Sequence, residues 1–188
     1  LAERAARDLK VVLCGEGGDE LFAGYGRHRS VLRPSFFGGR APRKRGIFDG
    51  LKVLREVPSA WRAGIVETAN NAAVLSRSTL QVAQAVDCAD WLSHDLLTKV
   101  DRCLMYHSVE GRTPLLDSVI TNAAFNLPDS LKVNKGRGKY LLRRWLADRV
   151  PSAKPFSRKR GFTVPVIEWI SSESSKLGSL VAQQPGVL

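Results

Sequence analysis

The chain has 188 residues, of which 44% are hydrophobic and 25% are charged, a composition typical of a folded globular protein and not of a disordered segment. No run of 18 apolar residues occurs, which excludes a transmembrane helix, and the N-terminal residues lack the apolar stretch of a secretory signal. The three cysteines are odd in number and widely spaced. Such usage argues against a disulfide or zinc framework and favours a cytoplasmic protein with reduced thiols.

Basic residues outnumber acidic ones by 29 to 18, which gives a formal net charge of +11. Such an excess usually indicates an anionic partner: nucleic acid, a phosphate ester or an acidic neighbouring domain. The basic cluster at 40–45 lies in a loop rich in proline and glycine, and is either a solvated face or a binding patch. The cluster at 132–160 spreads over several predicted elements, which favours a folded phosphate site. We expect no nucleic-acid partner, because the aromatic residues do not alternate with the cations as a stacking platform requires.

The first predicted elements form a strand, a glycine-rich loop and a helix. After a short helix over residues 2–8, the apolar run Lys10–Cys14 predicts a buried strand, and residues 19–29 predict a helix. This order is the βα turn of a parallel α/β sheet. It is the one clear strand in a mostly helical sequence, and the sole methionine is Met105. We therefore expect an α/β fragment of a longer polypeptide.

Helices dominate the rest of the chain. Proline and glycine residues divide the sequence into predicted helices at 47–56, 59–75, 78–91, 93–106, 117–126, 139–149 and 165–176. We expect one domain over residues 1–170, followed by a frayed tail over 171–188 that is rich in Ser, Gln and Gly.

The loop after the predicted strand combines three carboxylates with three glycines. Glu16, Asp19 and Glu20 follow the strand directly, at the end of an α/β sheet where ligands bind. Glycines let a backbone approach a ligand closely, and carboxylates can bind Mg²⁺ or transfer a proton. The alternative is an ordinary turn with a helix-capping Asp19 and a first-turn Glu20. The spacing fits neither a dinucleotide-binding fingerprint nor a Walker loop.

An acidic residue lies on the apolar stripe of the helix predicted over residues 93–106. A helical wheel places Asp101 among Leu97, Val100, Leu104 and Met105. A carboxylate on a core-facing stripe is costly unless it is paired, so we expect Asp101 to be buried and bonded to a cation, with Arg112 the best candidate. Such a pair is either a structural ion pair or a ligand-facing acid.

Two lysine-containing segments of the basic half are candidate anion sites. Lys139 falls in the first turn of a predicted helix, where a cation opposes the helix dipole unless an anion lies nearby. The alternative is an ordinary surface lysine. Arg158, Lys159 and Arg160 stand side by side in a loop, where like charges repel one another unless they surround an anion.

The glycine-rich loop resembles that of the asparagine synthetase family. Val12–Tyr25 is similar to the family's Ser-Gly-Glu-Gly-x-Asp-Glu followed by Phe-x-Gly-Tyr, with Cys14 in place of the usual Ser. Asp95–Arg102 is similar to the family's Asp-Leu-Leu-x-Lys-Val-Asp-Arg, although His94 stands where Pro is usual, and Ser108–Asp117 matches the motif that follows it.

The resemblance extends into the basic half and covers residues 9–30 and 91–170, whereas residues 31–90 match only in being helical. It implies the C-terminal part of an adenine-nucleotide α-hydrolase-like domain, the PP-loop ATP pyrophosphatase fold. The ATP loop of that fold and the glutaminase domain of the family would then precede Leu1, and the fragment alone would be inactive.

The family's motifs imply roles for individual residues here. Asp19 would bind Mg²⁺, and Glu16 would take the proton or contact the intermediate. Lys139 and Lys159 would contact pyrophosphate and the adenylate, and Lys159 would act in catalysis. The loop would be shaped by Gly15 and Gly17, and the pocket supported by Asp101, Glu110 and Arg112.

The implied reaction is the ATP- and Mg²⁺-dependent amidation of aspartate through β-aspartyl-AMP, with ammonia supplied by glutamine hydrolysis. The implied protein is cytoplasmic and binds no membrane, and a homodimer is compatible with the resemblance. Relatives of this fold close β-lactam rings or amidate other acids, so the acceptor remains open. A basic nucleic-acid-binding module is the alternative of another class, supported by charge alone.

Overall fold

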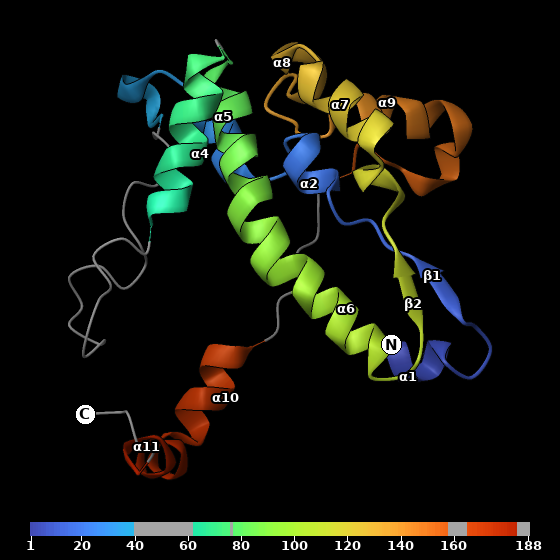
Figure 1. Cartoon of the computed structure of the whole chain (residues 1–188), viewed down its shortest axis with the longest axis vertical. Coiled ribbons are helices and arrows are strands. Elements are labelled where there is room, and N and C mark those ends of the chain that lie inside the picture. Colours follow the sequence, from blue (N-terminus) through green and yellow to red (C-terminus); the bar gives the residue numbers. More distant parts are fainter. Residues whose placement is uncertain (40–61, 76, 158–164, 184–188) are drawn as a thin grey trace. The chain divides into compact units, whose positions relative to one another are not determined.

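The computed structural model describes residues 1–39, 62–75, 77–157 and 165–183. It divides into two compact units, Leu1–Gly46 with Pro58–Pro155, and Ile47–Val57 with Phe156–Leu188 (Figure 1). The first unit contains the glycine-rich loop and is the one that matters for the candidate site. The helix predicted at 47–56 lies outside the described residues.

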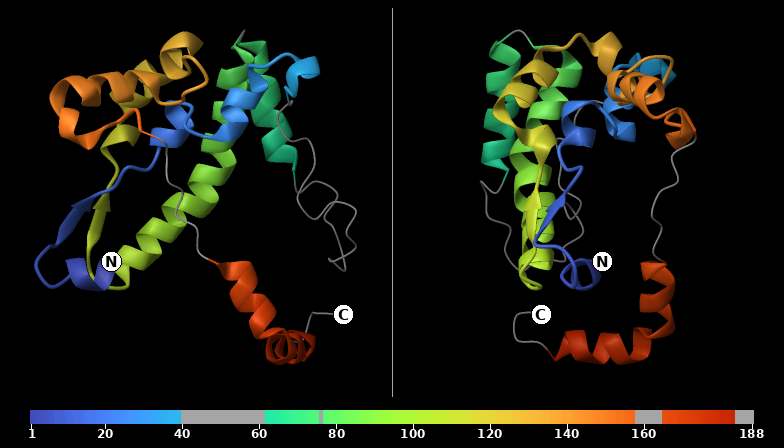
Figure 2. Two further views of the ribbon diagram at one scale, coloured as in Figure 1. Left: turned by 180° about the vertical axis from the view of Figure 1, so that it is seen from behind. Right: turned by 90° about the vertical axis from the view of Figure 1, so that its right-hand side faces the viewer.

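Two short parallel strands form the sheet of the first unit. Strand β1 (Val11–Leu13) is the predicted strand, and β2 (Glu110–Arg112) pairs with it in the register Val11↔Glu110 to Leu13↔Arg112. Both views of Figure 2 show the two strands side by side. The sequence analysis was wrong to find one strand alone, because Glu-Gly-Arg carries neither β-branched residues nor an apolar alternation. Parallel pairing requires a crossover, and the helices between the strands provide it.

The prediction that the first strand is buried was also wrong. Val11 is 46% exposed and Leu13 is 76% exposed. In parallel sheets of α/β proteins, helices normally cover both faces. Among the described residues, no helix covers these two side chains, because the sheet here has two strands and the helices pack mainly on one another.

One long helix crosses the first unit. It consists of α5 (Thr79–Asp87), the π-helix η2 (Cys88–Leu96) and α6 (Leu97–Met105), which join without a break because the residues at both junctions have helical dihedral angles. Ser78 begins it with a capping box that includes Gln81. No glycine or proline occurs between Thr79 and Met105, so the two helices predicted at 78–91 and 93–106 merge.

Shorter helices surround this one. They are α1 (Ala2–Ala5), α2 (Gly18–Leu21), α3 (Gly26–Val31), α4 (Ala63–Val74), α7 (Ser118–Asn126), α8 (Asp129–Lys132) and α9 (Tyr140–Arg149), with 3₁₀ turns at Ser35–Phe37, Pro114–Leu116 and Pro151–Ala153. The helix predicted over 19–29 is split into α2 and α3, because Ala23 between them has a left-handed backbone with φ of 58°.

The core of the first unit lies under α2. Leu21, Phe22 and Ala124 are buried together, and six partly buried residues pack against them: Cys88, Leu115, Leu116, Phe125, Leu127 and Leu142. These side chains come from α2, α7, α9, the long helix and the 3₁₀ turn Pro114–Leu116, including the residues that end α2 and α7. The core therefore holds the helix that carries Asp19 and Glu20.

Asp87 ties α3 to the long helix. Its Oδ2 accepts hydrogen bonds from Arg27 Nε at 2.8 Å and from His28 Nε2, whose side chain is fully buried, at 2.7 Å. Burial alone would raise the pKa of Asp87, but the hydrogen bonds from His28 and Arg27 outweigh it and lower the pKa.

The second unit contains α10 (Val166–Ser172) and α11 (Ser174–Ala182) within the described residues. The sequence predicts a helix over 165–176, and α11 occupies part of the range where it predicts a frayed tail. In the part of the chain that the structure describes, no helix is both long and apolar enough to cross a membrane.

Candidate functional site

The candidate site lies where β1 and β2 both end, at the same edge of the sheet. Cys14 N donates a hydrogen bond to Arg112 O at 2.7 Å and extends the pairing to the start of the loop. Gly17 has φ of 84°, and a Cβ on it would overlap the Leu116 side chain, so glycine is required there. Gly15 is exposed and faces open space, since no atom lies within 4 Å of where its Cβ would be. The loop backbone therefore packs against Leu116 at Gly17 and is open to solvent at Gly15.

Asp19 and Lys139 form an ion pair at this edge. Lys139 Nζ lies 3.0 Å from Asp19 Oδ2, and the side chains are 28% and 24% exposed, respectively. Lys139 directly precedes α9 and has a left-handed backbone with φ of 55°. Its backbone N donates to Phe22 O at 2.8 Å, which fixes the start of α9 against the end of α2. Two candidate residues far apart in sequence therefore meet in the structure.

Two glycines that the sequence analysis did not select make this contact possible. A Cβ on Gly24 would overlap both Asp19 Oδ1 and Lys139 Cε. A Cβ on Gly138 would overlap the carbonyl oxygen of Ala23. The available signal was the position of each glycine, one before Tyr25 and one before Lys139. Because Gly24 and Gly138 carry no side chains, α2 and the start of α9 can come close enough for the ion pair to form.

Glu16 lies in a field of mixed charge. Burial raises the pKa of its carboxyl group, and the negative charges of Glu20 and Asp19 raise it further, against the opposing charges of Lys99 and Lys139. Glu16 therefore binds a proton more readily than an ordinary glutamate does. Lys99, an exposed residue of α6, is a member of this group that the sequence analysis missed.

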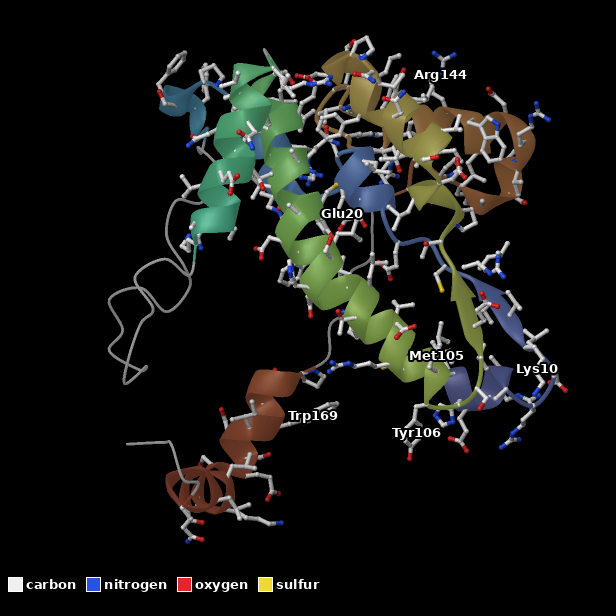
Figure 3. All side chains as sticks on the ribbon, in the orientation of Figure 1. Lys10, Glu20, Met105, Tyr106, Arg144 and Trp169 are labelled. Carbon is white, nitrogen blue, oxygen red and sulfur yellow. The ribbon has the colours of Figure 1, made fainter. Side chains whose placement is uncertain are left out.

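Glu20, a residue of α2, is buried, with 1% of its surface exposed, and its side chain lies toward the long helix (Figure 3). Tyr25 Oη donates a hydrogen bond to Glu20 Oε1. Burial and the negative charge of Glu20 raise the pKa of Tyr25 well above its ordinary value, so the phenol stays protonated and keeps donating. Of the three loop carboxylates, Glu20 thus serves the packing of the loop, whereas Glu16 and Asp19 are partly exposed.

The expectation that Asp101 is buried and bonded to Arg112 was wrong. Asp101 is exposed, and Arg112 Nε instead lies 2.6 Å from Glu110 Oε1 in an ion pair on the exposed strand β2. Val100 and Leu104 are the residues that pack, since a Cβ on Gly111 of β2 would meet both of their side chains.

The helical wheel made the apolar stripe of α6 too wide. Asp101 and Met105 are four residues apart and share the neighbouring face, where Met105 is 54% exposed (Figure 3). The predicted Asp101–Arg112 pair is therefore not formed, since Asp101 is exposed and Arg112 pairs with Glu110.

The sequence of residues 1–184 matches the Asparagine synthase family. The chain belongs to the asparagine synthase family. Among curated members, it is 28% identical to asparagine synthetase [glutamine-hydrolyzing] 1 of Bacillus subtilis over 94% of this chain and 34% of that protein. It is 25% identical to asparagine synthetase [glutamine-hydrolyzing] 3 of the same organism, over 93% of this chain and 31% of that protein. No solved structure is significantly similar to the chain.

This asparagine synthase family chain spans about a third of the length of these curated relatives. Lys159 lies outside the described residues, so the structure gives no position for its side chain. Within the described ranges, no group of three or more His, Cys, Asp and Glu side chains is arranged to hold a metal ion. Asp19 can therefore supply one carboxylate to a cation, and the other ligands would have to come from elsewhere.

Proposed function

We propose that the chain is part of a cytoplasmic, glutamine-hydrolysing asparagine synthetase. In the proposed reaction, the β-carboxylate of aspartate attacks the α-phosphate of ATP, which forms β-aspartyl-AMP and releases pyrophosphate. Ammonia then attacks the activated carbonyl carbon, loses a proton and displaces AMP. The observation that supports this proposal best is the Asp19–Lys139 pair at the end of two parallel strands, in a chain of this family.

Lys139 is proposed to neutralise charge on the phosphates. Its ammonium group lies beside Asp19 and Gly18, and no side chain caps the start of α9. A cation held by backbone packing in this way needs little reorganisation to meet charge that develops in a transition state. By the family's motif, Lys159 would supply a second cation.

Asp19 is proposed to hold Mg²⁺. Magnesium commonly takes one or two carboxylates from a protein and completes its ligand set with water and substrate phosphates. A single carboxylate in a site without a metal-binding cluster fits that pattern. When bound together, ATP and Mg²⁺ would supply the activated phosphate and partial neutralisation of its charge. Asp19 and Lys139 form an ion pair with each other in the structure. In a bound magnesium–phosphate group, the cation would pair with Asp19 and the phosphate with Lys139.

Glu16 is proposed to accept the proton that the attacking ammonia loses. The burial and neighbouring carboxylates that raise its pKa make it a stronger base than an ordinary glutamate at its operating pH. Gly15 and Gly17 would let the loop backbone approach the adenylate. A supporting role for Asp101, Glu110 and Arg112 rests on the family's motif alone.

The test of this function is a chimera. The chain replaces the matched third of the Bacillus subtilis synthetase 1, whose other two thirds supply the parts that the family requires. We expect aspartate-dependent ATP–pyrophosphate exchange and glutamine-dependent asparagine formation. Lys139→Ala should lower exchange by about 10²–10³-fold, as removal of one transition-state donor does, whereas the nearby exposed lysine variant Lys135→Ala should change it by less than about threefold.

A folded chimera without aspartate-dependent exchange would contradict the proposal. Exchange with another carboxylic acid in place of aspartate would keep the adenylation chemistry and replace the acceptor. Dimerisation and the delivery of glutamine-derived ammonia are part of the same proposal, and the chimera tests the second directly by comparing glutamine with free ammonia.

A further inference from the structure

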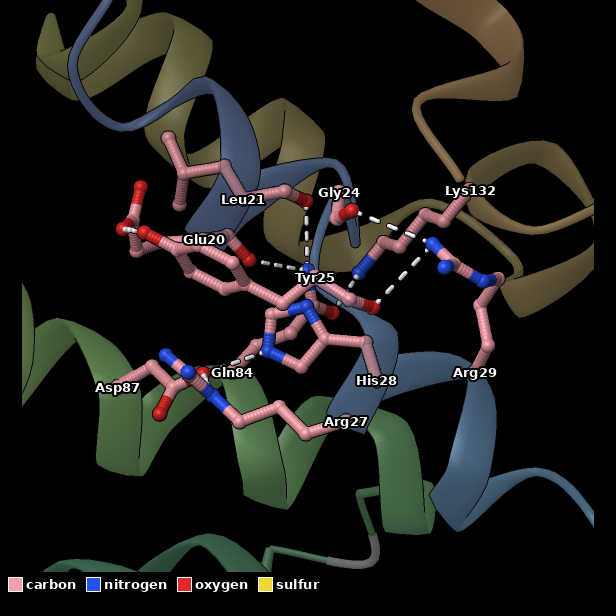
Figure 4. A network of polar contacts seen from close by, with 10 residues as sticks. All are labelled: Glu20, Leu21, Gly24, Tyr25, Arg27, His28, Arg29, Gln84, Asp87 and Lys132. Atoms are coloured by element: carbon pink, nitrogen blue, oxygen red, sulfur yellow. Dashed lines mark hydrogen bonds and ion pairs between the residues drawn. The ribbon is translucent and has the colours of Figure 1, made fainter. Parts of the chain in front are cut away.

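A buried polar pair contacts the C-terminal end of α2, the helix that follows the glycine-rich loop (Figure 4). Gln84 of α5 and Lys132 at the end of α8 are both fully buried. Gln84 Nε2 donates hydrogen bonds to Glu20 O at 2.6 Å and to Leu21 O at 2.7 Å. Gln84 Oε1 accepts from Lys132 Nζ at 2.9 Å. Neither residue was selected from the sequence, and neither carries part of the proposed reaction.

The acceptors are carbonyl groups at the ends of two helices. Helix α2 is four residues long, so its last carbonyls have no partner within the helix. Gln84 satisfies two of them. Lys132 Nζ also donates to Phe125 O near the end of α7, at 3.0 Å, and Gln81 Nε2 donates to the same oxygen at 2.8 Å. Through Gln84 and Lys132, the C-terminal ends of α2 and α7 are therefore held together.

Lys132 also determines which way the Gln84 amide points. An ammonium group has donors and no acceptor, so Gln84 must turn its oxygen toward Lys132. The amide nitrogen then faces α2, where both neighbours are acceptors. Burial lowers the pKa of Lys132 to about 8, against the opposing charge of Asp129, so the group remains mostly protonated at neutral pH. Lys132 thus fixes the donor orientation of Gln84 without touching α2 itself.

We propose that Gln84 and Lys132 are positioning residues for α2, the helix that follows the glycine-rich loop: they hold its C-terminal end and so set the positions of Asp19 and Glu20. The geometry of this arrangement is independent of the reaction, whereas its value for catalysis rests on the proposed function. Gln84 contacts backbone alone in α2 and so acts through Asp19 and Glu20 rather than on a substrate.

The test measures the pKa of Glu16 by carbon-13 NMR in the 188-residue chain, well below the unfolding temperature of each variant. The pKa of Glu16 reports the position of α2, because burial and the charges of Glu20 and Asp19 raise it. Gln84→Met removes all donors to α2. Lys132→Met removes the ammonium group that turns the Gln84 oxygen away from α2, and it introduces no negative charge.

Gln81→Met is the matched control, since Gln81 lies on the same helix and bonds to Phe125 O and to the Ser78 backbone but not to α2. We expect Gln84→Met and Lys132→Met each to lower the pKa of Glu16 toward its ordinary value, and Gln81→Met to leave it unchanged. An unchanged pKa in either of the first two variants, or an equal fall in Gln81→Met, would overturn the proposal. This readout involves neither nucleotide nor pyrophosphate, so the result is independent of the proposed reaction.

Discussion

Lys139 Nζ lies 3.0 Å from Asp19 Oδ2, and this ion pair joins the glycine-rich loop after β1 to the start of α9. The two side chains are each about one quarter exposed, so water weakens their attraction without removing it. Both groups remain accessible to a ligand with charges of both signs. The pair is therefore a link in the fold and a candidate binding site at once.

The Asp19–Lys139 pair should contribute a small, measurable coupling to stability. We expect Asp19→Asn and Lys139→Met each to lower the free energy of unfolding by about 0.5–1 kcal/mol, and the double variant to lose less than the sum. Urea unfolding of the four proteins in a double-mutant cycle measures the coupling. Strict additivity would show that the pair adds nothing to the folded state.

Glycine at position 138 should be essential for the approach of α9 to α2. Gly138→Ala places a methyl group against the carbonyl oxygen of Ala23, and we expect it to cost on the order of 2–4 kcal/mol. Gly15→Ala is the control, because the space around Gly15 is open, and it should change stability by less than about 0.5 kcal/mol. If thermal unfolding showed the two variants to be equally stable, the close contact would not exist in solution.

Lys132 should make stability depend on pH in the alkaline range. Its pKa is about 8 in the folded chain and 10.5 in the reference state, so between these values the unfolded chain binds the extra proton. Stability from this group therefore rises as the pH increases from about 8 to about 10.5, by roughly 1–3 kcal/mol. Comparing the pH dependence of urea unfolding in the wild type and in Lys132→Met isolates it. A wild-type slope that Lys132→Met does not change would contradict the assignment.

Asp101 should be dispensable for folding. The residue is exposed, so Asp101→Asn should change the free energy of unfolding by less than about 0.5 kcal/mol. Leu104→Ala, on the face of α6 that packs on Gly111, should cost about 2–3 kcal/mol. A loss above about 1 kcal/mol in Asp101→Asn would contradict this prediction and would favour the buried Asp101–Arg112 pair expected from the sequence.

The strand–loop–helix unit could be predicted because short stretches of neighbouring residues determine it. An apolar β-branched run and a group of glycines predict β1 and the loop, and β1 is confirmed at Val11–Leu13. The second strand could not be predicted in this way, since Glu110–Arg112 is extended through pairing with β1 and not through its own composition.

The residues that the sequence analysis missed depend on tertiary packing. Gln84 and Lys132 are residue types that usually lie at the surface. They are buried because α2, α5 and α7 pack together around them. The positive charge of Lys99 lowers the pKa of Glu16, a relationship between distant residues that no sequence period reveals. The prediction that Asp101 is buried was wrong for a related reason. The buried face of α6 is only as wide as its contact with Gly111.

Binding of magnesium pyrophosphate to the 188-residue chain tests the central claim most directly. Isothermal titration at one ionic strength compares the wild type with Lys139→Ala and with Lys135→Ala, which removes the same charge from the same segment. The account predicts Mg²⁺-dependent binding that Lys139→Ala weakens at least tenfold, about 1.4 kcal/mol, and that Lys135→Ala leaves within about twofold. Equal weakening by the two variants, or binding that Lys139→Ala does not affect, would contradict it.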